Sequence, residues 1–465
     1  MSSATFLIIG GGIAGVSCAE TLAYLCPNKS IILLTQSPLI KAVTNLVCLG
    51  KCITTFDVEE KHAKDVFSSK SLVNIVNDKL HYVCTQSRYV LCASGLKINF
   101  EYICICTGAR PKIIPQAVGH ERVLTIRDTE SVKDFQKLLN NARKIVIAGN
   151  GGIATELAYE LKGIEIDWVI KDKHITATFV DPGAAQFFQS KLNDKSFNES
   201  ENNAVIKRMR YYEDGESSSS GAALGPDWHN LLNLTPSNPL PGTVTVHFET
   251  EISQIENSKD EWPCYVILNN NKKIGCDIIV SATGVIPEMS FDWDVIPELG
   301  IDGGISVNEL METSLMNVYA AGDVCSANWN SSDHWFQMRL WSQARQMGAQ
   351  AAKSMVAKIN HESILPDFCF EMFSHVTKLF GYKVVLLGKY NGQGLGNKYE
   401  AIVRVTKDVE YIKLVLSNGK LQGAVMIGEV GLEETFENLI LNQLDISMYG
   451  EDILNPDIDI EDYFD

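Results

Sequence analysis

Two glycine-rich segments of the same type constrain this chain more than any other feature of its sequence. Gly10-Gly11-Gly12-Ile13-Ala14-Gly15 follows the apolar run 6–9, and Gly149-Asn150-Gly151-Gly152-Ile153-Ala154 follows the apolar run 145–148. Each segment stands where a buried strand turns into a helix, the context that a pyrophosphate-binding loop requires. The glycines allow a tight turn and a close approach of backbone to phosphate, and the helix amides face the anion. Two such loops in one chain predict two bound dinucleotides, with a hydride passing between them.

Length, charge and cysteine usage narrow the class of protein. At 465 residues the chain is too long for one core, so we expect two to four domains. The net charge of −17 argues against direct nucleic-acid binding and against binding to anionic membranes. We find neither a membrane-length apolar stretch nor a secretory signal. Without a secretory signal or an Arg-rich transit peptide, we expect a cytoplasmic or nuclear location. The 12 cysteines are sparse, irregularly spaced and without a Cys-x-x-Cys pair, which indicates reduced thiols.

Around each glycine segment the pattern predicts a strand–helix–strand unit. The expected elements are strand 5–10, helix 13–26 and strand 30–35 in the first unit, and strand 144–149, helix 153–162 and strand 165–171 in the second. The polar stretch 193–240 interrupts this regularity and is too poor in apolar residues to order itself, so we predict a mostly mobile insertion. Within it, 224–229 is apolar enough to dock on the surface.

A second duplication follows the first. A strand-like run at 102–106 leads into Thr107-Gly108-Ala109-Arg110-Pro111, and a run at 277–282 leads into Thr283-Gly284-Val285-Ile286-Pro287. The region from 368 onward differs and predicts a separate α+β domain. Its expected elements are helix 370–379, strands 383–388, 401–406, 411–416 and 421–428, and helix 432–443. Asn418-Gly419 predicts a hairpin turn between the last two strands.

The order of these motifs, completed by Gly322-Asp323 at the end of an apolar run, resembles the flavoprotein reductases with two dinucleotide-binding domains. That family includes disulfide reductases, NADH oxidases and ferredoxin reductases. The resemblance implies an α/β fold with two Rossmann-like domains and a C-terminal α+β domain. FAD would bind at the first glycine segment, and NADPH or NADH at the second. The implied boundaries are 1–142 and 282–365 for a split FAD domain, 143–281 for the nucleotide domain, and 366–465 for the last domain with its acidic tail.

The resemblance also implies which residues hold the cofactors. Asp323 would bind the flavin ribityl chain, and the alternative is that Asp323 merely caps a following helix. The remaining members of the predicted cofactor-binding set, besides the glycine segments, are Thr35, Lys41, Thr107, Gly108, Ala109, Gly322, Ile153, Glu156, Lys171 and Gly284. No metal site is expected.

Two of these residues carry a joint electrostatic hypothesis. Related reductases place a Lys and a Glu near the flavin and nicotinamide, and Lys41 and Glu156 stand at the matching positions. A cation there would stabilise the reduced ring. The alternative makes Lys41 a surface lysine and Glu156 an ordinary first-turn acid. Lys171, at the end of the strand that reads the ribose, favours NADPH over NADH.

The chain departs from the family in two places. The acid expected on the FAD ribose is replaced by Thr35. The redox pair of the disulfide reductases, Cys-x4-Cys, is also absent. Cys48 and Cys52 lie nearby, but they are one residue too close together and lack the family context. Two alternatives to a redox pair stay open: the spacing of Cys48 and Cys52 is fortuitous, or one of them is a single thiol that faces the flavin.

Further segments resemble one branch of this family over essentially the whole chain. These are 40–45, 148–154, 223–229, 338–348, 433–443 and 457–465. What this implies is a nuclear and cytoplasmic FAD protein that oxidises NAD(P)H in oxidative-stress defence, and that protects the tRNA-splicing ligase as a protein partner. The predicted activity is hydride transfer from NAD(P)H to flavin N5 and on to an unidentified acceptor. Two alternatives stay open: a disulfide reductase using Cys48 and Cys52, and a partner-binding protein with little turnover whose conformation depends on FAD and NAD(P).

Overall fold

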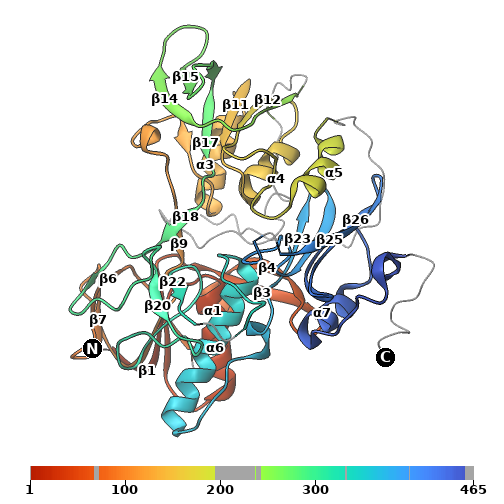
Figure 1. The fold of residues 1–465 in the computed structure, drawn as a ribbon. Coiled ribbons are helices and arrows are strands. Elements are labelled where there is room, and N and C mark those ends of the chain that lie inside the picture. Colours follow the sequence, from red (N-terminus) through yellow and green to blue (C-terminus); the bar gives the residue numbers. More distant parts are fainter. Residues whose placement is uncertain are drawn as a thin grey trace.

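The computed structural model describes residues 2–67, 73–193, 236, 242–329, 332–396 and 398–455. The three largest sheets in the described residues, each with its own helices, divide the molecule (Figure 1). The predicted insertion, apart from residues 193 and 236, and the acidic tail 457–465 lie outside the described residues. The α/β architecture with two Rossmann-like parts is confirmed, and the C-terminal part is rich in β structure.

The first sheet is built from two distant stretches of the chain. Its order is β19-β6-β7-β8-β1-β2-β5, and β21 also pairs with β8. The central strands β1 (Ser2–Ile9), β2 (Ile31–Thr35), β5 (Val73–Asn77), β8 (Lys97–Ile105) and β21 (Val318–Ala320) run parallel where they pair. The smaller strands are β6 (Leu80–Cys84), β7 (Tyr89–Cys92) and β19 (Asp292–Trp293). Because β21 pairs with β8, the chain returns to this sheet after forming the second one.

Helix α1 (Ile13–Leu25) packs against α6 (Trp341–Asn360) beside this sheet (Figure 1). The two backbones approach closely, since a side chain on Gly348 would collide with the carbonyl oxygen of Ala14. Small residues at the contact therefore let the return segment lie directly on the first glycine turn.

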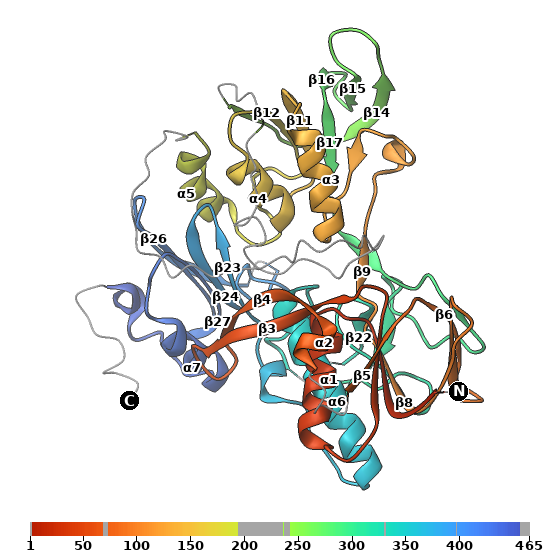
Figure 2. The ribbon, with the colours of Figure 1, turned by 180° about the vertical axis from the view of Figure 1, so that it is seen from behind.

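A long hairpin, which the sequence analysis did not predict, leaves the first sheet. Strands β3 (Leu39–Cys48) and β4 (Thr54–His62) pair antiparallel with a bulge between Thr44 and Val47, and the short helix α2 (Ala63–Val66) follows. Figure 2 shows the hairpin running between the first sheet and the C-terminal sheet, and β4 contacts β23 there. The hairpin thus connects the first glycine turn to the last part of the chain.

The second sheet has the order β10-β17-β11-β12-β13, and all its pairs are parallel. Its strands are β10 (Val123–Leu124), β11 (Lys144–Ala148), β12 (Glu165–Val169), β13 (Val244–His247) and β17 (Ile278–Ser281). Its helices are α3 (Thr129–Leu139), α4 (Gly152–Glu160) and α5 (Pro182–Asn193). An antiparallel meander of β14 (Ile252–Asn257), β15 (Cys264–Leu268) and β16 (Lys273–Cys276) lies beside it. The strand–helix–strand unit predicted after the second glycine segment is confirmed.

The C-terminal sheet is antiparallel and carries one helix, α7 (Glu433–Asn442). Its order is β23 (Ser374–Leu379), β24 (Tyr382–Gly388), β27 (Lys420–Ile427), β26 (Glu410–Ser417) and β25 (Glu400–Thr406). The predicted helix 370–379 is wrong, because 374–379 forms β23. Phe380 and Gly381, both with positive φ, turn the chain so tightly that β23 pairs with β24. Asn418 and Gly419 also have positive φ and form the predicted hairpin turn.

The C-terminal sheet shares one apolar core with the second sheet. Phe188 of α5 lies 4.7 Å from the ring of Phe380, and Phe187 lies 5.2 Å from the ring of Tyr382, between centroids. Asp181 forms a buried ion pair with Lys413 of β26. The remaining short elements are β9 (Ala109–Pro111), β18 (Val285–Pro287), β20 (Ile305–Val307), β22 (Cys325–Ala327), η1 (Pro115–Ala117), η3 (Phe368–Phe370) and η4 (Gly450–Leu454).

Candidate functional site

The first glycine segment forms a tight turn between β1 and α1. Gly10 has φ 117°, and a side chain there would collide with the carbonyl oxygen of Cys106. A side chain on Gly15 would collide with the carbonyl of Gly10, so helix and strand can pack closely only with glycine here. Gly12 is the N-cap of α1 and has no side chain with which to cap the helix. The first amides of the helix are therefore left to meet an anion.

The second glycine segment repeats this construction. Gly149 has φ 127°, and a side chain there would collide with the carbonyl oxygen of Ala282. Gly151 is the N-cap of α4, again without a side-chain cap, and a Cβ added to it would meet no atom within 4 Å. The open space beside Gly151 lies where backbone would approach a pyrophosphate.

The two Thr-Gly pairs close the two turns in the same way. The carbonyls that pack against Gly10 and Gly149 belong to Cys106 and Ala282. Each of these two residues directly precedes a Thr-Gly pair. Gly108 and Gly284 both have positive φ. The residues after them, including Ala109, form the antiparallel ribbon β9–β18, which crosses between the first and second sheets (Figure 1). The internal duplication read from the sequence is thus present in the backbone.

Asp323 lies beside the first glycine turn. Gly322 has φ 79°, and a side chain on it would lie 2.8 Å from Cβ of Ala14, so the Gly322-Asp323 pair rests on the start of α1. The strand β22, not a helix, follows Asp323, so the helix-cap alternative is wrong. Burial raises the pKa of the Asp323 carboxyl, and the charges of Arg339 and Arg127 oppose that rise. Among the described residues, none forms a hydrogen bond with this carboxylate, which suits it to hydroxyl donors of a polyol.

Arg127 belongs to the same site, and the sequence analysis missed it. Its Nη2 lies 3.6 Å from the place where a Cβ on Gly108 would stand, and its charge acts on Asp323. Its Nε is buried and has no hydrogen-bond partner in the described part of the chain. A half-buried guanidinium group whose buried Nε is unsatisfied is well suited to an anionic ligand. No local sequence signal marks Arg127, because only the fold brings it to Gly108.

Lys41 is attached to the first glycine turn by its backbone and to β4 by its side chain. Its N–H donates to the carbonyl of Gly11 at 3.0 Å, and Nζ lies 3.1 Å from Oε1 of Glu60. Both side chains are almost completely buried, at 1 and 3 % exposed. Thr129, in the first turn of α3, donates to the Glu60 carboxylate. Glu60 was not predicted, because it faces Lys41 only through the β3–β4 register.

The other predicted residues of the first site have the following positions. Thr35 ends β2, and its hydroxyl donates to the carbonyl of Ser37 at 3.0 Å while lying 2.6 Å from a Cβ placed on Gly11. Thr107 donates through its hydroxyl to the carbonyl of Glu288. Both side chains therefore shape the backbone around the turn.

Ile153 and Glu156 lie in α4 directly after the second turn, and both are half-buried. Lys171 is exposed just beyond the end of β12. The joint role of Lys41 and Glu156 stays a prediction.

Cys48 and Cys52 do not form an activated dithiol beside a glycine turn. Cys52 is fully buried against α7, where its N–H donates to Oε1 of Glu437 at 2.6 Å. Burial and, after it, the nearby Glu437 raise the pKa of the Cys52 thiol to about 12. A nucleophilic thiol requires the opposite shift. Cys48 is exposed, and all 12 cysteines are free thiols, as predicted.

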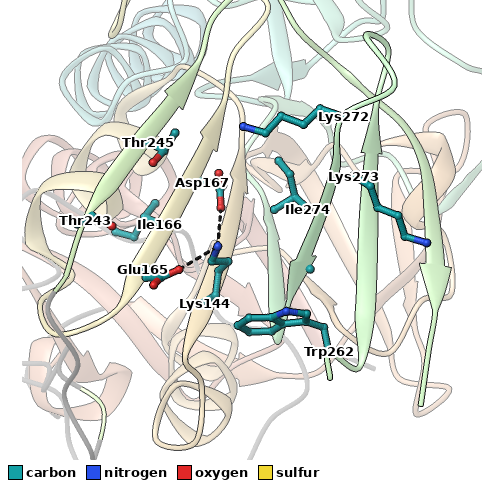
Figure 3. Close-up of a pocket in the computed structure, with 11 residues that line it drawn as sticks. Lys144, Glu165, Ile166, Asp167, Thr243, Thr245, Trp262, Lys272, Lys273 and Ile274 are labelled. Atoms are coloured by element: carbon teal, nitrogen blue, oxygen red, sulfur yellow. Dashed lines mark ion pairs between the residues drawn. The ribbon is translucent and has the colours of Figure 1, made fainter. Parts of the chain in front are cut away.

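A separate polar cavity of about 310 Å³ lies at the other end of the second sheet (Figure 3). Lys144 stands between Glu165 and Asp167, at 2.9 and 3.4 Å, and Trp262 and Lys272 lie across the cavity. These residues surround the amino ends of β11, β12 and β13, whereas the glycine turn follows the carboxyl end of β11. The cavity is therefore not part of the predicted nucleotide site.

Two further findings bear on function. No helix in the described ranges is long and apolar enough to cross a membrane. The same ranges contain no cluster of three or more His, Cys, Asp or Glu side chains placed to hold a metal ion.

Comparison with known proteins supports the construction described above. The family model for pyridine nucleotide-disulphide oxidoreductases matches residues 4–210 and 242–348. The model for the C-terminal domain of rubredoxin NAD+ reductase matches residues 374–444. Among solved structures, the chain resembles a ferredoxin reductase from Rhodopseudomonas palustris, with a TM-score of 0.70, 16 % identity and complete coverage of both chains. It also resembles putidaredoxin reductase in its complex with putidaredoxin, with a TM-score of 0.66, 15 % identity, and coverage of 96 % of this chain and 94 % of that one.

Full-length relatives are more similar still. The pyridine nucleotide-disulfide oxidoreductase domain-containing protein 1 of Drosophila melanogaster is 50 % identical over 473 residues, covering 99 % of each chain. The human protein of the same name is 46 % identical over 499 residues, covering 99 % of this chain and 98 % of the relative. The chain therefore belongs to the pyridine nucleotide-disulfide oxidoreductase family, whose members bind FAD and use NAD(P)H.

Proposed function

We propose that the chain is an FAD-dependent NAD(P)H oxidoreductase that takes a hydride from NADH or NADPH and passes the electrons to an acceptor still to be identified. The observation that carries this proposal is the matched construction of the two turns. In each turn, a glycine with positive φ packs against the carbonyl that precedes a Thr-Gly pair. A second glycine, which has no side chain to bond the helix amides, is the N-cap of the following helix. Bound FAD supplies a ring whose N5 accepts the hydride.

The residues of the first turn would hold FAD. The amides at the start of α1 meet the pyrophosphate, and the open carboxylate of Asp323 accepts hydrogen bonds from the ribityl hydroxyls. Arg127, with its unsatisfied Nε, offsets negative charge beside Gly108. Lys41, held by Glu60, places a fixed ion pair next to Gly11.

The residues of the second turn would hold the nicotinamide nucleotide. Gly151 leaves room for its pyrophosphate, and Glu156 lies one helical turn further along α4. We propose the domain boundaries 142/143, 281/282 and 365/366. We also propose a role in oxidative-stress defence in cytoplasm and nucleus, with protection of the tRNA-splicing ligase, on the strength of the sequence resemblance alone.

A spectroscopic titration tests the proposal. The purified protein should show visible flavin absorption, and anaerobic addition of NADH or NADPH should bleach it. Gly12→Val should yield colourless protein because its side chain enters the phosphate space, whereas Thr21→Val, further along α1, should stay yellow. A fully flavin-loaded Gly12→Val variant would remove the basis of the assignment.

The same titration separates the rival activities. Replacing Cys48 and Cys52 together by Ser should leave flavin reduction and turnover unchanged, since Cys52 is buried against Glu437. Turnover that collapses while reduction persists would instead support a disulfide reductase. Reduction without turnover on any small acceptor, together with NAD(P)-dependent binding of a protein, would favour the partner-binding function.

A further inference from the structure

One side chain, Asn150, holds the loop after β12 against the second glycine turn. Asn150 lies between Gly149 and Gly151 and is only 8 % exposed. Its Nδ2 donates to Oδ2 of Asp172 and to the carbonyl of His174, both at 2.9 Å. Its Oδ1 accepts from the N–H of Thr176 at 2.6 Å. The carboxamide therefore uses both its ends to fix residues 172–176 on the turn.

The loop is fixed in a strained conformation. Thr176 has φ 58°, a region that β-branched residues strongly disfavour. Its N–H is held by Asn150, and its hydroxyl lies 3.1 Å from that of Thr155 in α4. Strain of this kind persists only where surrounding bonds over-determine it, and it concentrates at functional sites. The strain at Thr176 therefore indicates that the position of this loop is important for function.

The consequence of this loop geometry is a fixed carboxylate beside the turn. Asp172 is half-buried, and its backbone carbonyl accepts from the N–H of Glu249 at 3.1 Å. Its Oδ2 is engaged by Asn150, while its Oδ1 receives no hydrogen bond from the residues that the structure describes. The neighbouring Lys171 and Lys173 are exposed. The charged group that the turn holds in place is thus the Asp172 carboxylate, whereas the sequence pattern favoured Lys171.

We propose that Asn150 is a positioning residue that presents Asp172 to the adenosine ribose, and that the site thereby selects NADH over NADPH. A carboxylate at this place in a dinucleotide-binding unit accepts hydrogen bonds from the ribose hydroxyls and repels a 2′-phosphate. This inference rests on the proposed function, because it requires a nicotinamide nucleotide at the second turn. The proposed selection of NADH differs from the sequence-based expectation, in which Lys171 favoured NADPH.

Binding of two fragments to the full-length, flavin-loaded chain tests the inference. ADP-ribose and 2′-phospho-ADP-ribose lack nicotinamide, so calorimetry reports binding without electron transfer. ADP-ribose should bind at least about tenfold more tightly, the ratio expected for one hydrogen bond to a charged group. Asp172→Asn should weaken the binding of ADP-ribose and strengthen the binding of 2′-phospho-ADP-ribose, so the ratio of the two affinities should fall. Lys173→Ala, an exposed neighbour, should leave it unchanged.

Variants of Asn150 separate positioning from folding. Asn150→Ala should abolish the preference for ADP-ribose while flavin absorption is retained. In the double variant Asn150→Ala/Thr176→Gly the φ strain is gone, so stability should recover while the preference stays lost.

Three results would overturn the inference. They are equal or tighter binding of the 2′-phosphate form by the unchanged protein, an unaltered ratio in Asp172→Asn, and a preference that returns in the double variant. Failure of the unchanged protein to bind either fragment would overturn the proposed function of the second turn, and this inference with it.

Discussion

His375 makes the junction of the three parts of the molecule sensitive to acid. It is the second residue of β23 and is 2 % exposed. Its ring lies 5.0 Å from Trp341 of α6 and 6.1 Å from Phe179, between centroids. Nδ1 lies 3.3 Å from the hydroxyl of Ser342, and Nε2 has no hydrogen-bond partner in the described ranges. Nothing in this packing offers a counter-ion to a protonated ring.

Burial alone lowers the pKa of His375 from 6.5 to about 3. Below pH 6.5 the unfolded chain binds a proton that the folded chain refuses, so the free energy of unfolding falls as the pH drops toward 3. The slope is about 1.4 kcal/mol per pH unit. Between pH 7 and pH 5 this one residue should therefore remove about 2 kcal/mol of stability.

Denaturant unfolding of the flavin-loaded protein at several pH values measures this loss. His375→Phe should keep the ring packing of an apolar site and should lose about 2 kcal/mol less than the unchanged protein on going from pH 7 to pH 5. His361→Asn is the matched control, because His361 is exposed and Asn tolerates its positive φ. Parallel pH profiles for His375→Phe and the unchanged protein would refute the reasoning.

Three further experiments test the site. Gly149→Ala should destabilise the protein by about 1–3 kcal/mol or more, because Gly149 has a positive φ and lies against a carbonyl. Gly151→Ala should leave stability unchanged and weaken nucleotide binding. Equal melting temperatures of the two variants would contradict this expectation. Lys41→Met should lower the free energy of unfolding by about 3–5 kcal/mol because it leaves the buried Glu60 carboxylate without its counter-ion, and adding Glu60→Gln should restore much of that loss in denaturant unfolding. Asp323→Ala should raise the dissociation constant for FAD roughly tenfold or more, measured by flavin release on dilution, and unchanged release would exclude the ribityl role.

Parts of the fold whose signal is local could be predicted from the sequence. The ends of the strands and helices around Gly10 and Gly149 were predicted to within three residues, because buried runs and glycine turns are encoded in adjacent positions. The β3–β4 hairpin was missed because its outer half is exposed on β3, so the strand lacks a regular alternation. Glu60 and Arg127 were missed for a related reason: each reaches the site through pairing or packing with a distant segment.

The role of the C-terminal part could not be predicted from its local sequence either. The sequence predicted a separate domain, yet its strands complete the core of the second sheet. Tyr390 donates from its hydroxyl to the carbonyl of Thr178, and Asn391 donates to that of Phe179. Phe179 in turn lies 3.5 Å from a Cβ placed on Gly152. Asn150 thus holds the start of the segment 172–179, and two residues just after β24 hold its end. The C-terminal part therefore supports the loop beside the second glycine turn, which no local sequence pattern could indicate.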